Sequence, residues 1–276
     1  RYTDYTDRDY CIAKGMEVYG HEYAMHFPWH RWPAAPDRKV SPVHDKVKAL
    51  GGVVGVYNGW ERANWFAKPG DDTSEAATQT WDRAGPWEAR IREECEAVRD
   101  HVGVLDLPGF SRFKVEGPGA DEWLRGLVAG ALPKLGRAGL VYFADHRGRI
   151  VTEMTVAREA EDLFILVTAA SAQWHDRDWL TRHMPQDAGF TLTDWTDRMS
   201  TLIVTGPKSR DLMATLCDAD LTLPWLSLQE TEIAGRWAAL VRLSFAGELG
   251  WEIHAENADM PAIHDAVIAA GAKPFG

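Results

Sequence analysis

One stretch of the chain decides its fold, and it reads Phe113-Lys114-Val115-Glu116-Gly117-Pro118-Gly119. The residues before Gly117 predict a strand, the Gly-Pro-Gly predicts a turn, and residues 120–128 have a helical pattern. The same order returns as a strand at 202–205, Gly206-Pro207 and a helix at 209–216. The sequence therefore predicts a pseudo-repeat of two strand–turn–helix units.

The segment between these units completes the fold prediction. Strands are expected at 140–144, 150–156 and 164–168, followed by a helix at 172–183. Meandering strands with helices on one face indicate an α+β fold rather than a doubly wound parallel sheet. The chain contains no Gly-x-Gly-x-x-Gly pattern, so no dinucleotide-binding fold is expected within it.

The chain divides into three parts by composition. Residues 1–66 are rich in aromatic side chains and interrupted by prolines, which predicts an irregular connector packed against a partner domain, with one helix near 42–50. Residues 67–84 form a polar linker, and residues 85–276 form the sheet-and-helix domain. The chain starts at Arg1 without an initiator methionine, so we expect it to be a piece of a longer protein.

Charge and hydropathy exclude two classes of partner. The 276 residues carry a formal net charge of −11, which disfavours binding to nucleic acid because that binding depends on Lys and Arg. No apolar run approaches the roughly 20 residues that cross a bilayer, so no membrane role is expected. The three cysteines, Cys11, Cys95 and Cys217, have no paired spacing, so neither a disulfide framework nor a zinc site is expected. A reducing compartment is therefore favoured.

No metal site is expected elsewhere. His26 and His30 have the spacing of a helical metal pair, but Pro28 lies between them and disfavours a helix there.

Two carboxylates are candidate site residues. Glu248 lies between Gly247 and Gly250 in a turn at a strand end, where a carboxylate can accept paired hydrogen bonds from a flat N–H/NH₂ edge such as that of a pterin. Glu153 lies in the alternating strand 150–156, where a half-buried carboxylate can act as a base. The alternatives are a hairpin with solvated acids for Glu248 and a water-facing side chain for Glu153.

Several motifs resemble those of the glycine cleavage T-protein (aminomethyltransferase) family in order and interval. They lie at residues 96–107, at Val115-Glu116-Gly117-Pro118, at Val204-Thr205-Gly206-Pro207 and at Gly247-Glu248-Leu249-Gly250-Trp251-Glu252. Residues 1–66, especially Gly59-Trp60-Glu61-Arg62-Ala63-Asn64-Trp65-Phe66, resemble the connector of dimethylglycine and sarcosine dehydrogenases. The resemblance covers nearly the whole chain.

The resemblance implies an activity and its cofactors. An FAD-binding domain of the same protein, N-terminal to this region, would oxidise an N-methyl amine to an iminium. This region would bind tetrahydrofolate and trap the one-carbon unit as 5,10-methylenetetrahydrofolate. The expected partners are folate, the N-methyl amine substrate and that flavin-binding domain. The expected location is the cytoplasm in a bacterium or the mitochondrial matrix in a eukaryote.

The resemblance also assigns site residues. Glu248 matches the pterin-binding glutamate, and Phe245 stands where the family has a tyrosine. Thr152 replaces the aspartate that is catalytic in T-proteins, so Glu153, the next residue, is the candidate catalytic acid. Three further candidate folate contacts are Leu140, which replaces a common tyrosine, Thr152 itself and Trp251, while later family contacts would lie beyond Gly276.

Other functions share parts of this pattern. A folate-dependent S-demethylase has the same fold without a flavin, but the connector argues against it. A relative that modifies tRNA would need a cysteine-containing loop beyond Gly276, and the acidic charge disfavours it. A non-catalytic domain that seals a channel for a partner flavoprotein remains the alternative from a different class.

Overall fold

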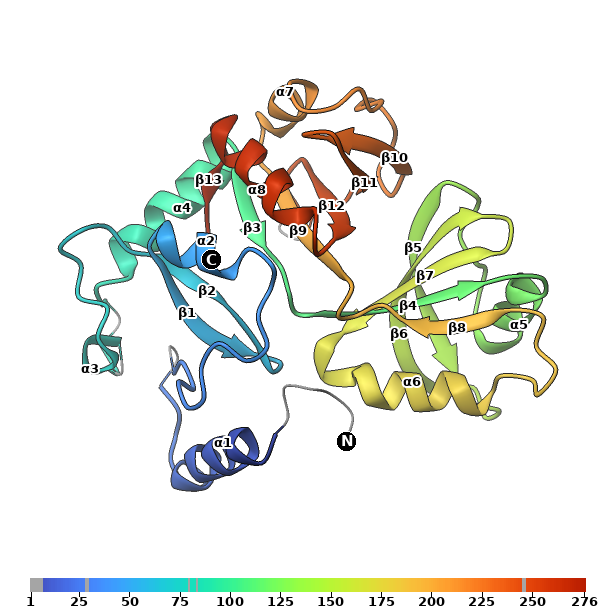
Figure 1. Ribbon diagram of the computed structural model, residues 1–276, viewed down its shortest axis with the longest axis horizontal. Helices are drawn as coiled ribbons and strands as arrows, with labels where there is room; N and C mark the ends of the chain where they lie inside the picture. Colours follow the sequence, from blue (N-terminus) through green and yellow to red (C-terminus); the bar gives the residue numbers. More distant parts are fainter. Residues whose placement is uncertain (1–6, 28–29, 79, 83, 245–246) are drawn as a thin grey trace.

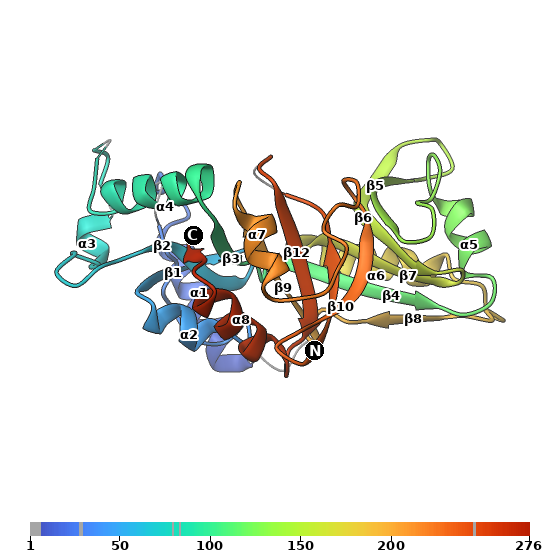
Figure 2. The ribbon, with the colours of Figure 1, turned by 90° about the horizontal axis from the view of Figure 1, so that it is seen from above.

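The computed structural model describes residues 7–27, 30–78, 80–82, 84–244 and 247–276. It contains two large, mainly antiparallel sheets that lie side by side, with the N-terminal region packed against one of them (Figures 1 and 2). Within the described residues, no helix is both long and apolar enough to cross a membrane.

The first large sheet has five strands in the order β5-β6-β7-β4-β8, all antiparallel to their neighbours. Its strands are β4 (Phe110–Glu116), β5 (Arg137–Ala144), β6 (Ile150–Ala160), β7 (Leu163–Ala169) and β8 (Thr191–Asp194). Helices α5 (Ala120–Leu127) and α6 (Gln173–Arg182) cover its outer face, and η1 (Ala170–Ala172) leads into α6.

The second large sheet has six strands in the order β10-β11-β12-β9-β3-β13. Its strands are β3 (Gly103–Asp106), β9 (Met199–Thr205), β10 (Leu228–Ile233), β11 (Arg236–Val241), β12 (Gly250–Glu256) and β13 (Lys273–Pro274). Helices α7 (Ser209–Ala214) and α8 (Met260–Ala269) pack on its outer face. The α+β class and the expected meander are confirmed.

The pseudo-repeat is visible in the strand orders. Each sheet contains three consecutive strands followed by the strand that precedes them in the chain, which gives β5-β6-β7-β4 and β10-β11-β12-β9. The fifth strand is exchanged: β3 precedes β4 in the chain but pairs with β9, and β8 precedes β9 but pairs with β4. The two units are therefore joined by backbone hydrogen bonds in both directions.

The turns after β4 and β9 have the same backbone geometry. Gly117 and Gly206 both have φ of 125°, a region that residues with a Cβ rarely adopt. A Cβ on Gly206 would lie 2.4 Å from the carbonyl oxygen of His101. These glycines allow each strand to turn tightly into its helix.

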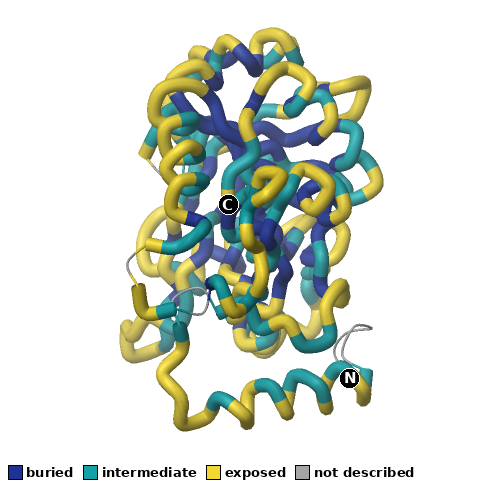
Figure 3. Tube along the Cα trace, turned by 90° about the vertical axis from the view of Figure 1, so that its left-hand side faces the viewer, coloured by how far each residue is buried: buried dark blue, intermediate teal, exposed yellow. Residues whose placement is uncertain are grey.

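The N-terminal region is more regular than the sequence analysis anticipated. The expected helix near residue 45 is present as α2 (His44–Ala49), but the structure adds α1 (Arg8–Gly20), whose side chains are partly or fully exposed (Figure 3). It also adds a hairpin of β1 (Gly52–Tyr57) and β2 (Trp60–Phe66). Asn58 and Gly59 both have positive φ, as a two-residue hairpin turn requires. The Asn-Gly pair is therefore a hairpin signal in the sequence itself.

The hairpin is held by apolar contacts on two sides, and its Ala63 belongs to the core of the second sheet. Val53 and Trp65 pack on Trp87 at the start of α4 (Glu88–Asp100), and the short helix α3 (Glu75–Thr78) lies in the preceding segment. Domain boundaries at residues 66 and 84 stay predictions.

A buried acid links the N-terminal region to the second sheet. The hydroxyl of Ser41 donates to Asp106 Oδ2 at 2.5 Å, and Asp106 Oδ1 is buried without a hydrogen-bond partner. Burial raises the pKa of Asp106 to about 7, although the bond from Ser41 acts in the opposite direction.

We expect Gly206→Ala to destabilise the protein by about 2 kcal/mol or more, because the new methyl group meets a carbonyl oxygen and the φ is unfavourable. Chemical denaturation measures this change. Gly126→Ala is the matched control, since a Cβ there meets nothing within 4 Å and alanine favours the helix. Equal effects of the two substitutions would contradict the role of Gly206.

A second prediction concerns pH. Because the folded-state pKa of Asp106 is raised from 3.8 to about 7, its contribution to stability is complete at low pH and is lost as pH rises through 7. We expect the melting temperature to fall between about pH 4 and pH 7 and to level off above pH 7, and Asp106→Asn to flatten this slope while retaining the bond from Ser41. The control, Asp218→Asn, removes an exposed carboxyl and should keep the wild-type slope. An unchanged slope in Asp106→Asn would show that another group causes the dependence.

Candidate functional site

A cavity of about 70 Å³ lies between the inner faces of the two large sheets, and we call it the inter-sheet cavity. Its walls are mostly apolar. The lining residues are Phe110, Ala138, Thr155, Ala157, Glu159, Ile165, Val167, Trp195, Met199, Leu228, Trp237, Ala239, Val241, Leu243, Glu252 and His254. A mainly apolar cavity with a few polar groups is the usual form of a small-molecule site.

Strand β12 supplies two of the polar groups through its alternation. Trp251 and Ile253 point into the core beneath α7 and α8, so Glu252 and His254 point to the opposite face, toward the cavity. Glu252 is only 8% exposed. A carboxylate so deeply buried needs a hydrogen-bond partner.

That partner is part of a chain of polar side chains. Glu252 Oε2 lies 3.0 Å from Nε2 of His254, and Nδ1 of His254 lies 2.9 Å from the hydroxyl of Thr201. The same hydroxyl accepts a hydrogen bond from Nη2 of Arg112. Arg112 belongs to β4, so the chain of contacts crosses from the first sheet to the second.

Glu159 adds a second acid to the cavity wall. Burial raises the pKa of its carboxyl, and the nearby Glu230 acts in the same direction.

The structure places Glu248 beside a different cavity. Glu248 is partly exposed, two residues before β12, and borders a space of about 330 Å³. The other lining residues are Trp225, Arg242, Ser244, Gly247, Leu249 and Gly250. The loop is fixed by the carbonyl of Leu249, which accepts hydrogen bonds from the backbone of Gly206 at 2.8 Å and the hydroxyl of Ser209 at 3.0 Å. Phe245 lies outside the described residues.

Leu140 and Glu153 lie together at the edge of the inter-sheet cavity. Leu140 pairs with the cavity-lining Thr155, and Glu153 is the preceding residue on the same face of β6, about 7 Å further along. Leu140 is 57% exposed, and Glu153 is also exposed. Tyr142, which pairs with Glu153 and is 39% exposed, adds an aromatic ring to this edge.

Thr152 and Trp251 are placed on other faces. Thr152 pairs with Phe143, a core residue beneath α5 and α6, so its side chain lies on the face of β6 opposite to Glu153. Trp251 is 1% exposed and belongs to the core of the second sheet. Neither side chain borders the inter-sheet cavity.

Sequence reasoning missed Glu252, His254, Arg112 and Thr201. The alternation of Trp251, Ile253 and Ala255 did contain a signal, because it places Glu252 and His254 on one face of a strand. What the alternation cannot tell is whether that face meets water or a second sheet.

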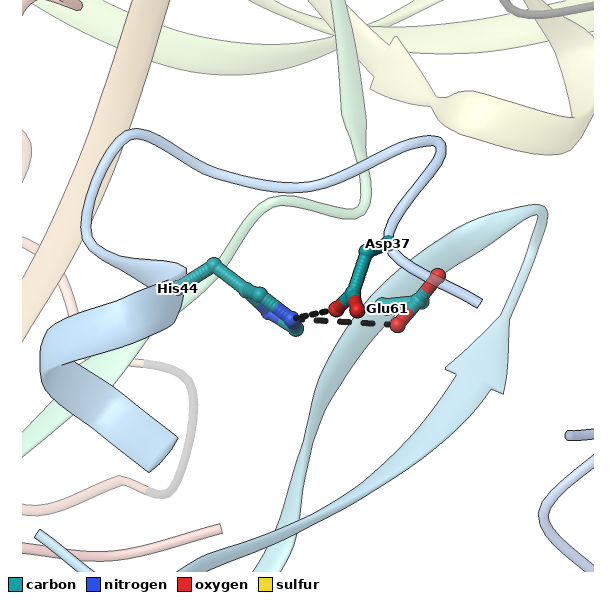
Figure 4. Close-up of side chains that lie close together, drawn as sticks. All are labelled: Asp37, His44 and Glu61. Atoms are coloured by element: carbon teal, nitrogen blue, oxygen red, sulfur yellow. Dashed lines mark hydrogen bonds and ion pairs between the residues drawn. The ribbon is translucent and has the colours of Figure 1, made fainter. Parts of the chain in front are cut away.

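A third group of polar residues lies in the N-terminal region (Figure 4). Asp37, His44 and Glu61 bring one potential metal-ligand atom each within 4.8 Å of one another. Asp37 Oδ1 accepts from Nε2 of His44 at 2.9 Å and from Nζ of Lys48 at 3.0 Å. Lys48 already supplies a positive charge, so the geometry is explained by an ion-pair cluster that fastens the loop before α2.

The sequence and the fold both match a known protein family. The family model described as the GCVT N-terminal domain matches residues 43–276, and the chain belongs to this family. The resemblance to aminomethyltransferases and to dimethylglycine and sarcosine dehydrogenases is thereby confirmed.

Similar sequences come from larger proteins. Human mitochondrial dimethylglycine dehydrogenase is 28% identical over an alignment of 276 residues. The alignment covers 98% of this chain and 31% of that protein. The 4-methylaminobutanoate oxidase (formaldehyde-forming) of Paenarthrobacter nicotinovorans is 32% identical over 270 residues, covering 96% of this chain and 32% of that protein. The chain thus spans about a third of the length of these relatives.

Solved structures agree in fold. Glycine cleavage system aminomethyltransferase T from Bartonella henselae superposes with a TM-score of 0.67 at 20% identity, covering 83% of this chain and 57% of that one. The heterotetrameric sarcosine oxidase from Corynebacterium sp. U-96 gives a TM-score of 0.51 at 16% identity, covering 83% of this chain and 93% of that one.

Proposed function

We propose that this chain is the connector and folate-binding aminomethyltransferase-like region of a flavin-dependent N-methyl amine demethylase. The observation that carries the proposal is the buried carboxylate of Glu252 in the wall of a mainly apolar cavity. Family membership and the names of the relatives supply the reaction class.

The residues present fit the donor edge of a pterin. Among the described residues, Glu252 Oε1 has no hydrogen-bond donor, whereas Oε2 is held by His254. An ionised carboxylate with a free oxygen accepts hydrogen bonds from an N–H/NH₂ edge, and the apolar walls suit the ring face. The cavity is narrow for a whole bicyclic ring, so Trp237, which is partly exposed at its wall, would have to move outward.

This arrangement reassigns one role from the sequence analysis. The resemblance gives the pterin-binding role to Glu248, whereas the acids that line the inter-sheet cavity are Glu252 and Glu159. Glu248 and Glu252 both follow Phe245 within the same motif, and substitution of each separates the two assignments.

The other residues have positioning and proton-transfer roles. When bound, tetrahydrofolate supplies the nitrogen atoms that receive the one-carbon unit, giving 5,10-methylenetetrahydrofolate. Glu252 orients the ring by its donor edge. Glu153, exposed at the edge of the cavity, accepts a proton there, and Leu140 and Tyr142 offer apolar surface beside it.

The remaining parts of the reaction belong outside this chain. FAD and the N-methyl amine would be bound by a flavin-binding domain of the same protein, since this chain has no dinucleotide-binding glycine pattern. The compartment would be the bacterial cytoplasm or the mitochondrial matrix; one relative is named as mitochondrial and another comes from a bacterium.

A second candidate is a non-catalytic domain that closes a channel on a flavoprotein. Two observations favour it: the cavity is narrow, and one relative is named as formaldehyde-forming. Such a domain would not bind tetrahydrofolate.

We expect Glu252→Gln to weaken tetrahydrofolate binding by about 2 kcal/mol or more, because it removes the charge that the donor edge pairs with. Titration calorimetry on the full-length protein measures this loss. Glu248→Gln is the matched control on the neighbouring loop and should bind within about twofold of wild type. The reverse pattern would return the role to Glu248, and no binding by the wild type would support the channel-closing domain.

Glu153→Gln tests proton transfer. If Glu153 accepts a proton at the cavity edge, we expect formation of 5,10-methylenetetrahydrofolate to slow by about 100-fold while folate affinity changes little. Product formation with saturating folate measures the rate, and calorimetry measures the affinity. A loss of affinity at an unchanged rate would mean that Glu153 binds the ligand instead.

A further inference from the structure

The polar chain that ends at Glu252 begins at a buried cation. Arg112 is 2% exposed and projects from the inner face of β4 across to β9. Its Nη1 donates to the carbonyl oxygen of Met199 at 3.1 Å, and its Nη2 donates to the hydroxyl of Thr201. A guanidinium in such a place is costly unless it has hydrogen-bond partners and a compensating charge.

Glu252 provides the compensating charge. Burial lowers the pKa of Arg112 to about 10, and the Glu252 carboxylate partly offsets this effect. Arg112 therefore stays charged at neutral pH. The side chains of Thr201 and His254 lie between the cation and the anion, and their hydrogen bonds connect the two charges.

The direction of every hydrogen bond in this chain follows from its first member. Arginine has donors but no acceptor, so the hydroxyl of Thr201 must accept from Arg112. The hydroxyl proton also needs an acceptor, and Nδ1 of His254 is its neighbour, so we assign Nδ1 as the unprotonated nitrogen. The remaining ring proton lies on Nε2 and is donated to Glu252 Oε2.

A protonated histidine fits this arrangement less well. An imidazolium would donate from Nδ1 to Thr201, and the threonine proton would then lose its acceptor in a site that is 1% exposed. Such a buried donor without a partner is unfavourable.

We propose that Arg112, Thr201 and His254 are positioning residues that fix the neutral Nε2–H form of His254 and, through it, hold Glu252 with one oxygen free toward the inter-sheet cavity. This inference rests on the proposed function for the identity of the ligand, but the state of His254 does not depend on it. This series of hydrogen bonds connects Arg112, on the inner face of the first sheet, to Glu252 of the second sheet.

The ring nitrogens of His254 provide the direct test. We expect long-range ¹H–¹⁵N spectra of protein labelled at histidine to show a proton on Nε2 and a hydrogen-bonded, unprotonated Nδ1, with the signals assigned by loss in His254→Gln. Thr201→Val keeps the side-chain shape and removes the hydroxyl, so the Nδ1 signal should shift to the position of a nitrogen without a hydrogen bond. Thr168→Val is the matched control, because it removes another buried hydroxyl, which donates to Asp176 at 2.7 Å on the opposite side of the first sheet.

Folate affinity provides the second readout. We expect Thr201→Val to weaken tetrahydrofolate binding roughly fivefold, which corresponds to about 1 kcal/mol, and Thr168→Val to leave it unchanged. His254→Gln should bind more tightly than His254→Asn, because the longer amide still reaches Glu252 with an N–H donor.

The outcomes separate the two proposals. If wild type binds no tetrahydrofolate but the Nδ1 signal of His254 shifts in Thr201→Val, the proposed function fails and the positioning chain stands. If the Nδ1 signal is the same in wild type and Thr201→Val, or if His254 carries its proton on Nδ1, the positioning chain is overturned whatever the ligand.

Discussion

The reciprocal pairing of β3 with β9 and of β8 with β4 is the constraint on which the rest of the structure depends. Each unit lends its edge strand to the other, so the two units of the repeat cannot separate without breaking backbone hydrogen bonds in both sheets. Because their outer faces are covered by helices, their inner faces have to meet across a shared space. The inter-sheet cavity is a consequence of this topology.

The shared space between the inner faces restricts which polar side chains can lie there. Polar groups placed there are removed from water, and each must find a partner or be destabilising. Thr201 and the carbonyl oxygen of Met199 accept from Arg112, whose Nε has no partner, and His254 pairs with Glu252, which leaves one carboxylate oxygen available at the cavity. The chemistry of the candidate site is thus tied to how the two units are held together.

The N-terminal region shows the same dependence on packing. Its hairpin is too small to be stable alone and is held by Trp65 against Trp87. Ser41 and the buried Asp106 join the region to β3, close to the point where the strands are exchanged. This junction therefore links the connector to the same framework that shapes the cavity.

The sequence by itself determined the elements and their grouping. The strand–turn–helix pattern at Gly117 and Gly206 gave the pseudo-repeat, because a tight turn with positive φ restricts the residue type at that position. The alternation in β6 and β12 assigned side chains to faces, and the motifs assigned the family. Even the missed hairpin had a local signal in Asn58-Gly59.

Tertiary structure alone decided which strand faces meet. Glu252 and Glu248 are four residues apart and chemically identical, so no local pattern ranks one above the other. Only the exchange of strands places Glu252 opposite the first sheet, where Thr201 and His254 connect it to a cation from β4, and leaves Glu248 at a separate loop. The physical reason is that burial depends on contacts between residues distant in sequence, and a single sequence records those contacts only indirectly.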